Sequence, residues 1–299
     1  MKKHYLYVLF FCSISFTNVK AQDLLSTLGD DAPAKEYIKN AFKSTRVIAS
    51  HSLEFLGPGV LDFRILHRFG RVNGGTYEAF GFDQARIRLG LDYGISKRLM
   101  VGIGRSSYKK ESDAFVKYRL LWQSTGQGGI PLSVVLTSGI TNIGLKWENT
   151  DQKNYYSSRL AYYFQAIIGR KFSDAISVQL MPSMIHRNLV ATNEDKNDIY
   201  AVGVGARIKL SKRTAFTVDY YYQFPNQLPD DIQMPLSIGF DIETGGHVFQ
   251  LHFTNALGMN ERAIICDTDG QWGKGDIHFG FNISRVFTVV KHKPAPSNG

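Results

Sequence analysis

The chain has 299 residues, a formal net charge of +9 at pH 7 and a mean hydropathy of −0.17. Beyond the N-terminus, no apolar run approaches the roughly 18 to 20 residues that a membrane-spanning helix needs, which excludes a helical membrane protein. No linker, low-complexity tract or composition break divides the sequence, so we expect one domain.

The first 21 residues have the pattern of a secretory signal peptide. Lys2 and Lys3 precede an apolar run, and Val19 and Ala21 are placed as in an A-x-A cleavage site. Cleavage after Ala21 would remove three lysines, lower the formal charge to +6 and leave a single cysteine, so no intramolecular disulfide is expected. We therefore predict an exported protein, for which no nucleic-acid partner is expected.

Residues 22–55 lack a regular alternation of apolar and polar side chains. Asp31 can cap a short helix, with Pro33 near its first turn. The apolar residues on one face of this helix would be Ile38, Ala41 and Phe42. A strand is conceivable over 47–55.

From Val60 onward, apolar and polar residues alternate with a period of two, which only an extended strand converts into two different faces. The clearest segment sets Ala85, Ile87, Leu89, Leu91 and Tyr93 against Gln84, Arg86, Arg88, Gly90 and Asp92. Strands are predicted at 60–69, 84–93, 98–107, 113–123, 131–141, 157–168, 175–186, 198–210, 214–224, 235–242, 246–254 and 274–290.

Tight turns alternate with long polar connections between these strands. The short turns are GISKR, FSD, SKR and ETGG. The long connections span 142–156, 187–197, 225–234 and 255–273. This asymmetry is typical of outer-membrane barrels. We predict an all-β fold, a single antiparallel transmembrane β-barrel over residues 56–290 with about 12 strands, or 14 if residues 22–55 add a hairpin. Otherwise 22–55 would plug the lumen or line its periplasmic mouth, and 291–299 would form a flexible tail.

Five blocks of sequence resemble one family. They are HRFGRVNGG at 67–75, FGFDQARIRLGLDYGISKRLMVGIGRSS at 80–107, FVKYRLLWQ at 115–123, GHVFQLHFTN at 246–255 and GDIHFGFNISRVF at 275–287. Together they resemble an uncharacterised family of β-barrel proteins from Bacteroidota, classed as a domain of unknown function, over roughly residues 40 to 290. The resemblance implies an exported outer-membrane barrel of a Gram-negative bacterium, and it supplies no substrate and no catalytic residue.

If the apolar faces meet lipid, the polar faces line the lumen, because an arginine at the bilayer midplane costs roughly 2 to 4 kcal/mol on the lipid side. The candidate pore-lining residues are Arg64, Arg68, Arg86, Arg88, Lys117, Arg119, Arg207 and Lys209. The acidic residues on the same faces are Asp62, Asp92, Asp219 and Asp276. Crowded like charges favour a wet lumen and predict a narrow pore for a small anionic solute. The alternative is a lumen closed by Arg–Asp ladders, as in a binding or scaffold protein.

The spacing of residues gives little support for a catalytic site or a metal site. His252 and His278 lie on polar faces of neighbouring strands, but neither has a cysteine or carboxylate at ligand spacing, so no metal and no other cofactor is expected. The residues available to a hydrolase are Ser106, Ser107, His67, His186 and Asp113. Nothing in their spacing selects them, and the sequence has no G-x-S-x-G motif.

We therefore predict a non-enzymatic outer-membrane barrel whose partners are outer-membrane lipids and the barrel-insertion machinery. The alternatives are a barrel hydrolase acting on lipid or envelope polymer, and a secreted soluble β protein.

Overall fold

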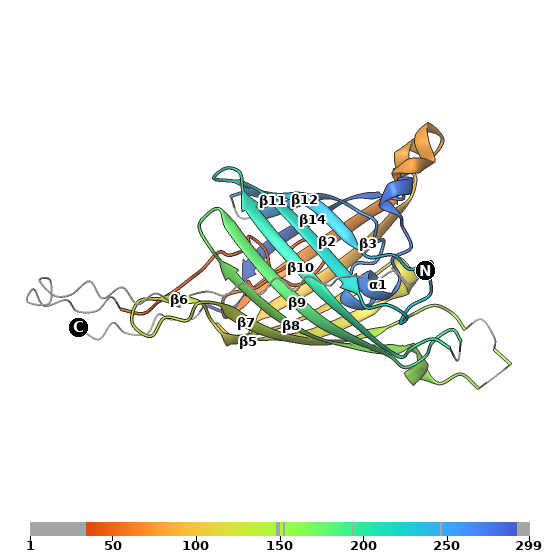
Figure 1. The fold of residues 1–299 in the computed structure, drawn as a ribbon, viewed down its shortest axis with the longest axis horizontal. Coiled ribbons are helices and arrows are strands. Elements are labelled where there is room, and N and C mark those ends of the chain that lie inside the picture. The colour runs from red at the N-terminus through yellow and green to blue at the C-terminus, as the bar shows by residue number, and fades with distance from the viewer. Residues whose placement is uncertain (1–33, 148–149, 152, 193, 246, 292–299) are drawn as a thin grey trace, which may run out of the picture.

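The computed structural model describes residues 34–147, 150–151, 153–192, 194–245 and 247–291. Within these residues, twelve antiparallel strands close into a barrel (Figure 1). They are β2 (Val60–Arg71), β3 (Ala85–Gly94), β4 (Leu99–Ser106), β5 (Ser112–Leu121), β7 (Ser133–Asn142), β8 (Leu160–Lys171), β9 (Ile176–Arg187), β10 (Asp198–Lys209), β11 (Thr214–Gln223), β12 (Leu236–Thr244), β13 (His247–Thr254) and β14 (His278–Thr288). Each wall strand pairs with the next, and β14 closes the barrel on β2 with Ser284 opposite Arg64. The predicted barrel of about 12 strands is confirmed.

The two faces of the wall differ as the alternation predicts. Outward side chains are apolar and exposed, as at Leu89 (44%) and Ile103 (58%), whereas Arg88 and Asp92 on the inward face of β3 are buried. A bilayer favours this arrangement, because a closed barrel satisfies every backbone hydrogen bond and presents an apolar band to lipid. No helix in the described residues is long and apolar enough to cross a membrane.

The two ends of the barrel carry different connections. The turns after β3, β8, β10 and β12 are short, and they share one end with the start of β2 and the end of β14. We call this the inner end, because barrels of this kind have short periplasmic turns. The outer end carries the longer loops, with η1 (Val72–Gly81), η2 (Tyr108–Lys110), η3 (Tyr156–Arg159), α1 (Glu261–Cys266) and η4 (Trp272–Lys274). In Figure 1, η1 projects at the upper right, and β6 (Ser124–Thr125) lies at the opposite end, paired with β1 (Glu36–Tyr37).

Residues 41–56, here called the plug segment, lie inside the barrel and are mostly buried. Phe42, Val47 and Leu53 of this segment belong to a hydrophobic core that also includes inward-facing wall residues. The large wall residues of that core are Met100, Phe115, Val135, Tyr163, Ile167, Met181, Ile185, Ile199 and Tyr221. Ile264 and Ile265 of α1 join the same core from the outer end. The lumen therefore has an apolar side, formed by β4 to β11, where the plug segment packs.

The predicted N-terminal helix is wrong over the residues that the structure describes. Residues 34–42 contain only the short strand β1, and the plug segment forms one isolated bridge, between Arg46 and His51. Side chains of the wall take the place of helical hydrogen bonds: Gln250 Nε2 donates to the carbonyl of Val47 (2.7 Å) and Asn282 Nδ2 to that of Ile48 (2.8 Å). The conceivable strand at 47–55 and the 14-strand barrel are likewise not formed. The predicted signal peptide and most of the tail lie outside the described residues.

Candidate functional site

Six of the eight predicted pore-lining residues are buried inside the barrel: Arg64, Arg68, Arg88, Lys117, Arg119 and Arg207. The other two, Arg86 and Lys209, share the inward phase of their strands but are exposed at the outer and inner ends. All eight therefore belong to the lumen side of the wall. Whether they line a conducting path depends on what compensates their charges.

Acidic wall residues pair with two of these arginines. Arg88 Nε donates to Asp113 Oδ1 at 2.9 Å, and Arg88 Nη2 donates to Asp113 Oδ2. Arg64 Nη1 lies 3.2 Å from Asp62 Oδ2 and also donates to Thr45 Oγ1 of the plug segment at 2.8 Å. A lumen wall rich in arginine therefore does not have to be wet, because carboxylates and plug hydroxyls provide partners.

The plug segment itself compensates two further cations. Lys117 Nζ donates to the carbonyl of Glu54 at 2.7 Å, and Arg119 Nη2 to that of Leu53 at 3.2 Å. Both cationic groups also lie over the ring of Phe55, 4.7 and 4.3 Å from its centroid. These contacts fix the C-terminal part of the plug segment against β5.

Arg68 shares the lack of an ion pair in the described residues with Arg119 and Arg207, but it is the most deeply buried of the three. Its side chain is fully buried, and Nη1 donates to Asn282 Oδ1 and to the carbonyl of His67, both at 3.3 Å. Its Nε and Nη2 have no partner in the described residues, and no carboxylate there lies within 4.0 Å to form an ion pair. Neither ring nitrogen of the buried His252 makes a hydrogen bond of standard geometry in the described part of the chain, although the backbone of Gln250 lies close to the ring.

Two cavities enter the lumen along β14 and β2, one from each end. The outer cavity, about 410 Å³, is lined by Arg71, Arg86, Leu257 and His278 among others. The inner cavity, about 270 Å³, is lined by residues that include Thr45, Asp62, Glu243 and Ser284. On β2 the inward residues between them are Arg64, Leu66 and Arg68, which span roughly 13 Å at about 3.3 Å per residue. On β2 the nearest lining residues of the two cavities, Asp62 and Phe69, are seven residues apart, roughly 23 Å, and buried side chains fill the wall between them.

The plug segment and the outer loop that carries α1 meet at the centre of the lumen. Arg46 Nη1 of the plug segment lies 2.7 Å from Glu261 Oε1 of α1. His51 Nε2 lies 3.4 Å from the same carboxylate oxygen and 3.1 Å from the hydroxyl of Tyr163. The side chains of Arg46, His51 and Glu261 are all buried, so this contact joins two chain segments that enter from opposite ends.

A buried polar cluster ties α1 to the loop between β4 and β5. Asn260 caps the helix by accepting from the backbone N–H of Ala263 at 2.9 Å. Arg262 Nε donates to Glu111 Oε1 at 2.7 Å, and Asp267 lies 2.6 Å from Arg262 and 2.9 Å from Lys109. Burial raises the pKa of the Asp267 carboxyl, but the charges of Arg262 and Lys109 outweigh burial and lower it below its usual value.

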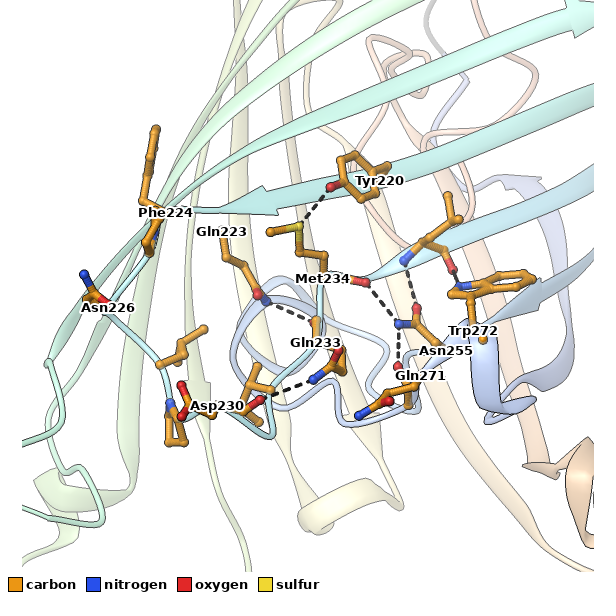
Figure 2. Close-up of a pocket in the computed structure, with 17 residues that line it drawn as sticks. Tyr220, Gln223, Phe224, Asn226, Asp230, Gln233, Met234, Asn255, Gln271 and Trp272 are labelled. Carbon is orange, nitrogen blue, oxygen red and sulfur yellow. Dashed lines mark hydrogen bonds between the residues drawn. The ribbon is translucent and has the colours of Figure 1, made fainter. Parts of the chain in front are cut away.

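A third cavity, about 700 Å³, lies at the outer end between the 224–235 connection and the loop before β14 (Figure 2). Tyr220, Phe224 and Trp272 contribute aromatic rings to it. Asn255 joins its two sides, since Nδ2 donates to the carbonyls of Met234 (3.0 Å) and Gly270 (2.8 Å). Its lining is thus aromatic and amide-rich.

The residues considered for a hydrolase are not brought together. Ser106 is buried and accepts from the backbone N–H of Tyr108, and Asp113 is taken by Arg88. His186 pairs with Asp198 at the outer end of the wall (Nδ1 to Oδ1, 2.6 Å), whereas His67 stacks on Phe281. Within the described residues, no three His, Cys, Asp or Glu side chains are grouped as a potential metal site.

Comparison with solved structures gives outer-membrane barrels and channels. A NanC porin has a TM-score of 0.47 and 8% identity, with 76% of this chain and 98% of that chain covered. The COG4313 outer membrane channel from Pseudomonas putida F1 gives 0.42 and 15%, over 79% and 98%. Outer membrane phospholipase A from Escherichia coli gives 0.43 and 11%, over 81% and 96%. These identities are too low to transfer an activity.

No curated protein matches the chain. The model of one family does match, over residues 42–287, and its description is a membrane-bound β-barrel domain, DUF5777. The match covers the plug segment and all twelve wall strands, and the apolar outer face of the wall agrees with the description. The chain therefore belongs to the DUF5777 family of membrane-bound β-barrel domains, and it is an outer-membrane β-barrel protein.

Proposed function

We propose that the protein provides a narrow, anion-preferring path along the β14–β2 side of the lumen, and that the plug segment closes this path in the conformation described. The observation that supports it is the pair of cavities that enter along the same two strands from opposite ends. Arg86 lines the outer cavity, and Arg64 and Arg68 occupy the wall between the two cavities. Basic side chains placed in this way favour anions over cations.

The contacts that close this side are mainly polar. Gln250 and Asn282 donate to the carbonyls of Val47 and Ile48, and Arg64 donates to Thr45. Water can replace the two amide bonds at a net cost of about 0.5 to 1.5 kcal/mol each, and the bond from the charged Arg64 at about 1.5 to 3 kcal/mol. A local shift of residues 44–48 would therefore connect the two cavities, while the rest of the plug segment stays packed on the apolar side.

The positions of the candidate catalytic groups support a non-enzymatic role. Ser106 is buried away from His67 and His186, and Asp113 is engaged by Arg88. A nucleophile and its base must lie within hydrogen-bond reach of each other, and these do not. A hydrolase is therefore the weaker alternative.

Planar bilayer recordings on the refolded full-length chain in a KCl gradient test the path. We expect small, infrequent openings that prefer chloride. Replacing Gln250 and Asn282 together by Ala removes the two bonds to the plug backbone and should increase the open time. Arg86→Glu should shift the reversal potential towards that of potassium, because Arg86 lines the outer cavity and is exposed.

The matched control is Lys212→Glu, the same charge change in the exposed turn between β10 and β11. It should leave the reversal potential near that of the unmodified chain. Correctly folded protein that shows no openings, either unmodified or with Gln250 and Asn282 replaced, would refute the path.

A second candidate function is ligand binding at the outer end, favoured by the cavity in Figure 2. Its aromatic rings and amides suit an uncharged, hydroxyl-rich ligand such as a sugar. Replacing Trp122 and Trp147 by Phe leaves Trp272 as the single tryptophan reporter. Saturable quenching of its fluorescence by a neutral oligosaccharide would support this function, and no change across a panel of such sugars would remove it.

A further inference from the structure

Arg68 and His252 face each other across a glycine inside the barrel. The register places Gly239, His252, Gly280 and Arg68 side by side on β12, β13, β14 and β2. A Cβ atom added at Gly280 would lie 2.4 Å from His252 Nε2 and 3.1 Å from Arg68 Cδ. The imidazole and the arginine side chain are therefore close neighbours over Gly280, where a larger residue would separate them.

Among the residues that the structure describes, none neutralises the charge of Arg68 at short range. Asp219 attracts it electrostatically, but it lies too far away for an ion pair and accepts hydrogen bonds from Ala49 and Ser50 of the plug segment. An uncompensated charge in a buried place costs several kcal/mol, so buried arginines in proteins are paired with an anion. Arg68 is fully buried and lacks such a pair in the described residues.

The unpartnered atoms of Arg68 are the ones that bind planar anions best. Nε and Nη2 form one edge of the guanidinium, and on Arg88 this same edge holds the carboxylate of Asp113 through two hydrogen bonds. Arg64 also leaves this edge without a partner, but Asp62 at its Nη1 balances the charge. In the described residues, this edge of Arg68 has no hydrogen-bond acceptor, and its charge has no carboxylate partner. His252, whose Nε2 lies over Gly280 beside the Arg68 side chain, can add one ring N–H donor.

We infer that Arg68 and His252 form a binding site for a small monovalent anion, a halide or a one-carbon carboxylate, inside the closed barrel. The donors would be Arg68 Nε and Nη2 together with one ring nitrogen of His252. The site takes a small ion because both side chains are closed off from solvent, at 0% and 1% exposure. It lies on the side of the lumen proposed as the anion path, but it does not depend on conduction, because it belongs to the closed conformation.

Thermal unfolding of the full-length protein in detergent tests the site. An ion that binds only the folded state raises the midpoint with the logarithm of its concentration, by about 3 °C for each tenfold increase above the dissociation constant. We expect this rise in chloride, bromide and formate, and its absence in gluconate at the same ionic strength, because gluconate is too large. Crystals grown in bromide should give an anomalous scattering peak beside Arg68.

Arg68→Gln should abolish the difference between chloride and gluconate. Arg213→Gln is the matched control, since Arg213 is an exposed arginine in the turn between β10 and β11, and it should keep the difference. If Arg68→Gln does not fold, His252→Ala should raise the chloride concentration of half-maximal effect about tenfold, as expected for the loss of one charge-assisted bond.

Equal midpoints in chloride and gluconate would overturn the site, as would a chloride effect that survives Arg68→Gln. A barrel that is stabilised by chloride but never conducts would refute only the path. A conducting barrel that is indifferent to chloride would refute only the buried site.

Discussion

The pair between Arg88 and Asp113 gives the sharpest prediction about the lumen. Arg88 on β3 reaches across Gly104 of β4 to bind Asp113 on β5, and both side chains are buried, at 1% and 8% exposure. Alternation alone would predict that Arg88→Glu assembles normally, because position 88 faces the lumen. The pairing reverses this expectation, because the substitution would bury two carboxylates against each other.

The expected loss is roughly 3 to 5 kcal/mol, the range for breaking a buried ion pair from one side. That is a large share of the free energy of unfolding of a typical domain, about 5 to 15 kcal/mol. The exchange of both charges, Arg88→Glu with Asp113→Arg, should recover part of the loss. Gly104→Ala should also destabilise the barrel, because its Cβ would lie 2.2 Å from Arg88 Nη2.

Urea unfolding in detergent, followed by tryptophan fluorescence and by heat-modifiable gel mobility, measures these effects. A double-mutant cycle over the two charges then isolates their interaction. The reasoning fails if Arg88→Glu costs less than about 1 kcal/mol, the most that exposed ion pairs usually contribute. It fails equally if the losses from the two single changes simply add in the exchanged variant.

Three further predictions concern the outer face and the α1 loop. Leu89→Arg places a charge on the lipid side and should cost roughly 2 to 4 kcal/mol or block insertion, seen as loss of heat-modifiable mobility, whereas Leu89→Phe should be tolerated. Burial raises the pKa of the Cys266 thiol to about 12, so maleimide should label it slowly at neutral pH and rapidly after unfolding; equal rates would show that the loop is open. Because the pKa of Asp267 is lowered, its carboxylate stabilises the fold at pH values above the usual Asp pKa, and this stabilisation is lost as the pH falls through the lowered pKa. Amide exchange in α1, corrected for intrinsic rates, should therefore be faster at pH 3 than at pH 5. The difference between the two pH values should be smaller in Asp267→Asn.

The wall of the barrel could be predicted because alternation fixes the strands one by one. The segment predicted at 84–93 is β3, Ala85–Gly94, and the segment predicted at 198–210 is β10, Asp198–Lys209. Lipid demands an apolar side chain at every second position, so the pattern has few exceptions on the outward face. Strand ends were less exact: the strand predicted at 274–290 spans only His278–Thr288, because η4 and a turn precede it.

The contents of the lumen could not be predicted in the same way. The sequence favoured a wet lumen and offered Arg–Asp ladders as the alternative, but the partners of Lys117 and Arg119 are backbone carbonyls of the plug segment, which carry no sequence signal. Two signals were present. The inward positions of 176–187 include Met181 and Ile185, which suit an apolar interior. The run AIIC at 263–266 is too apolar for a solvated loop.

The division of the lumen limits how a path could open. Phe42, Val47, Leu53 and Leu56 of the plug segment are buried in the core, and exposing a side chain of this kind costs roughly 1.5 to 3 kcal/mol. Releasing the whole segment would thus cost about as much as unfolding a domain. A shift confined to residues 44–48 also moves the buried Val47 and Ile48 and strains the ion pair between Arg46 and Glu261, but it leaves Phe42, Leu53 and Leu56 packed. Any opening that leaves the barrel folded must therefore be local and infrequent. Because Glu261 of α1 binds Arg46, one of the residues that would move, the outer loop is placed where it can bias that shift.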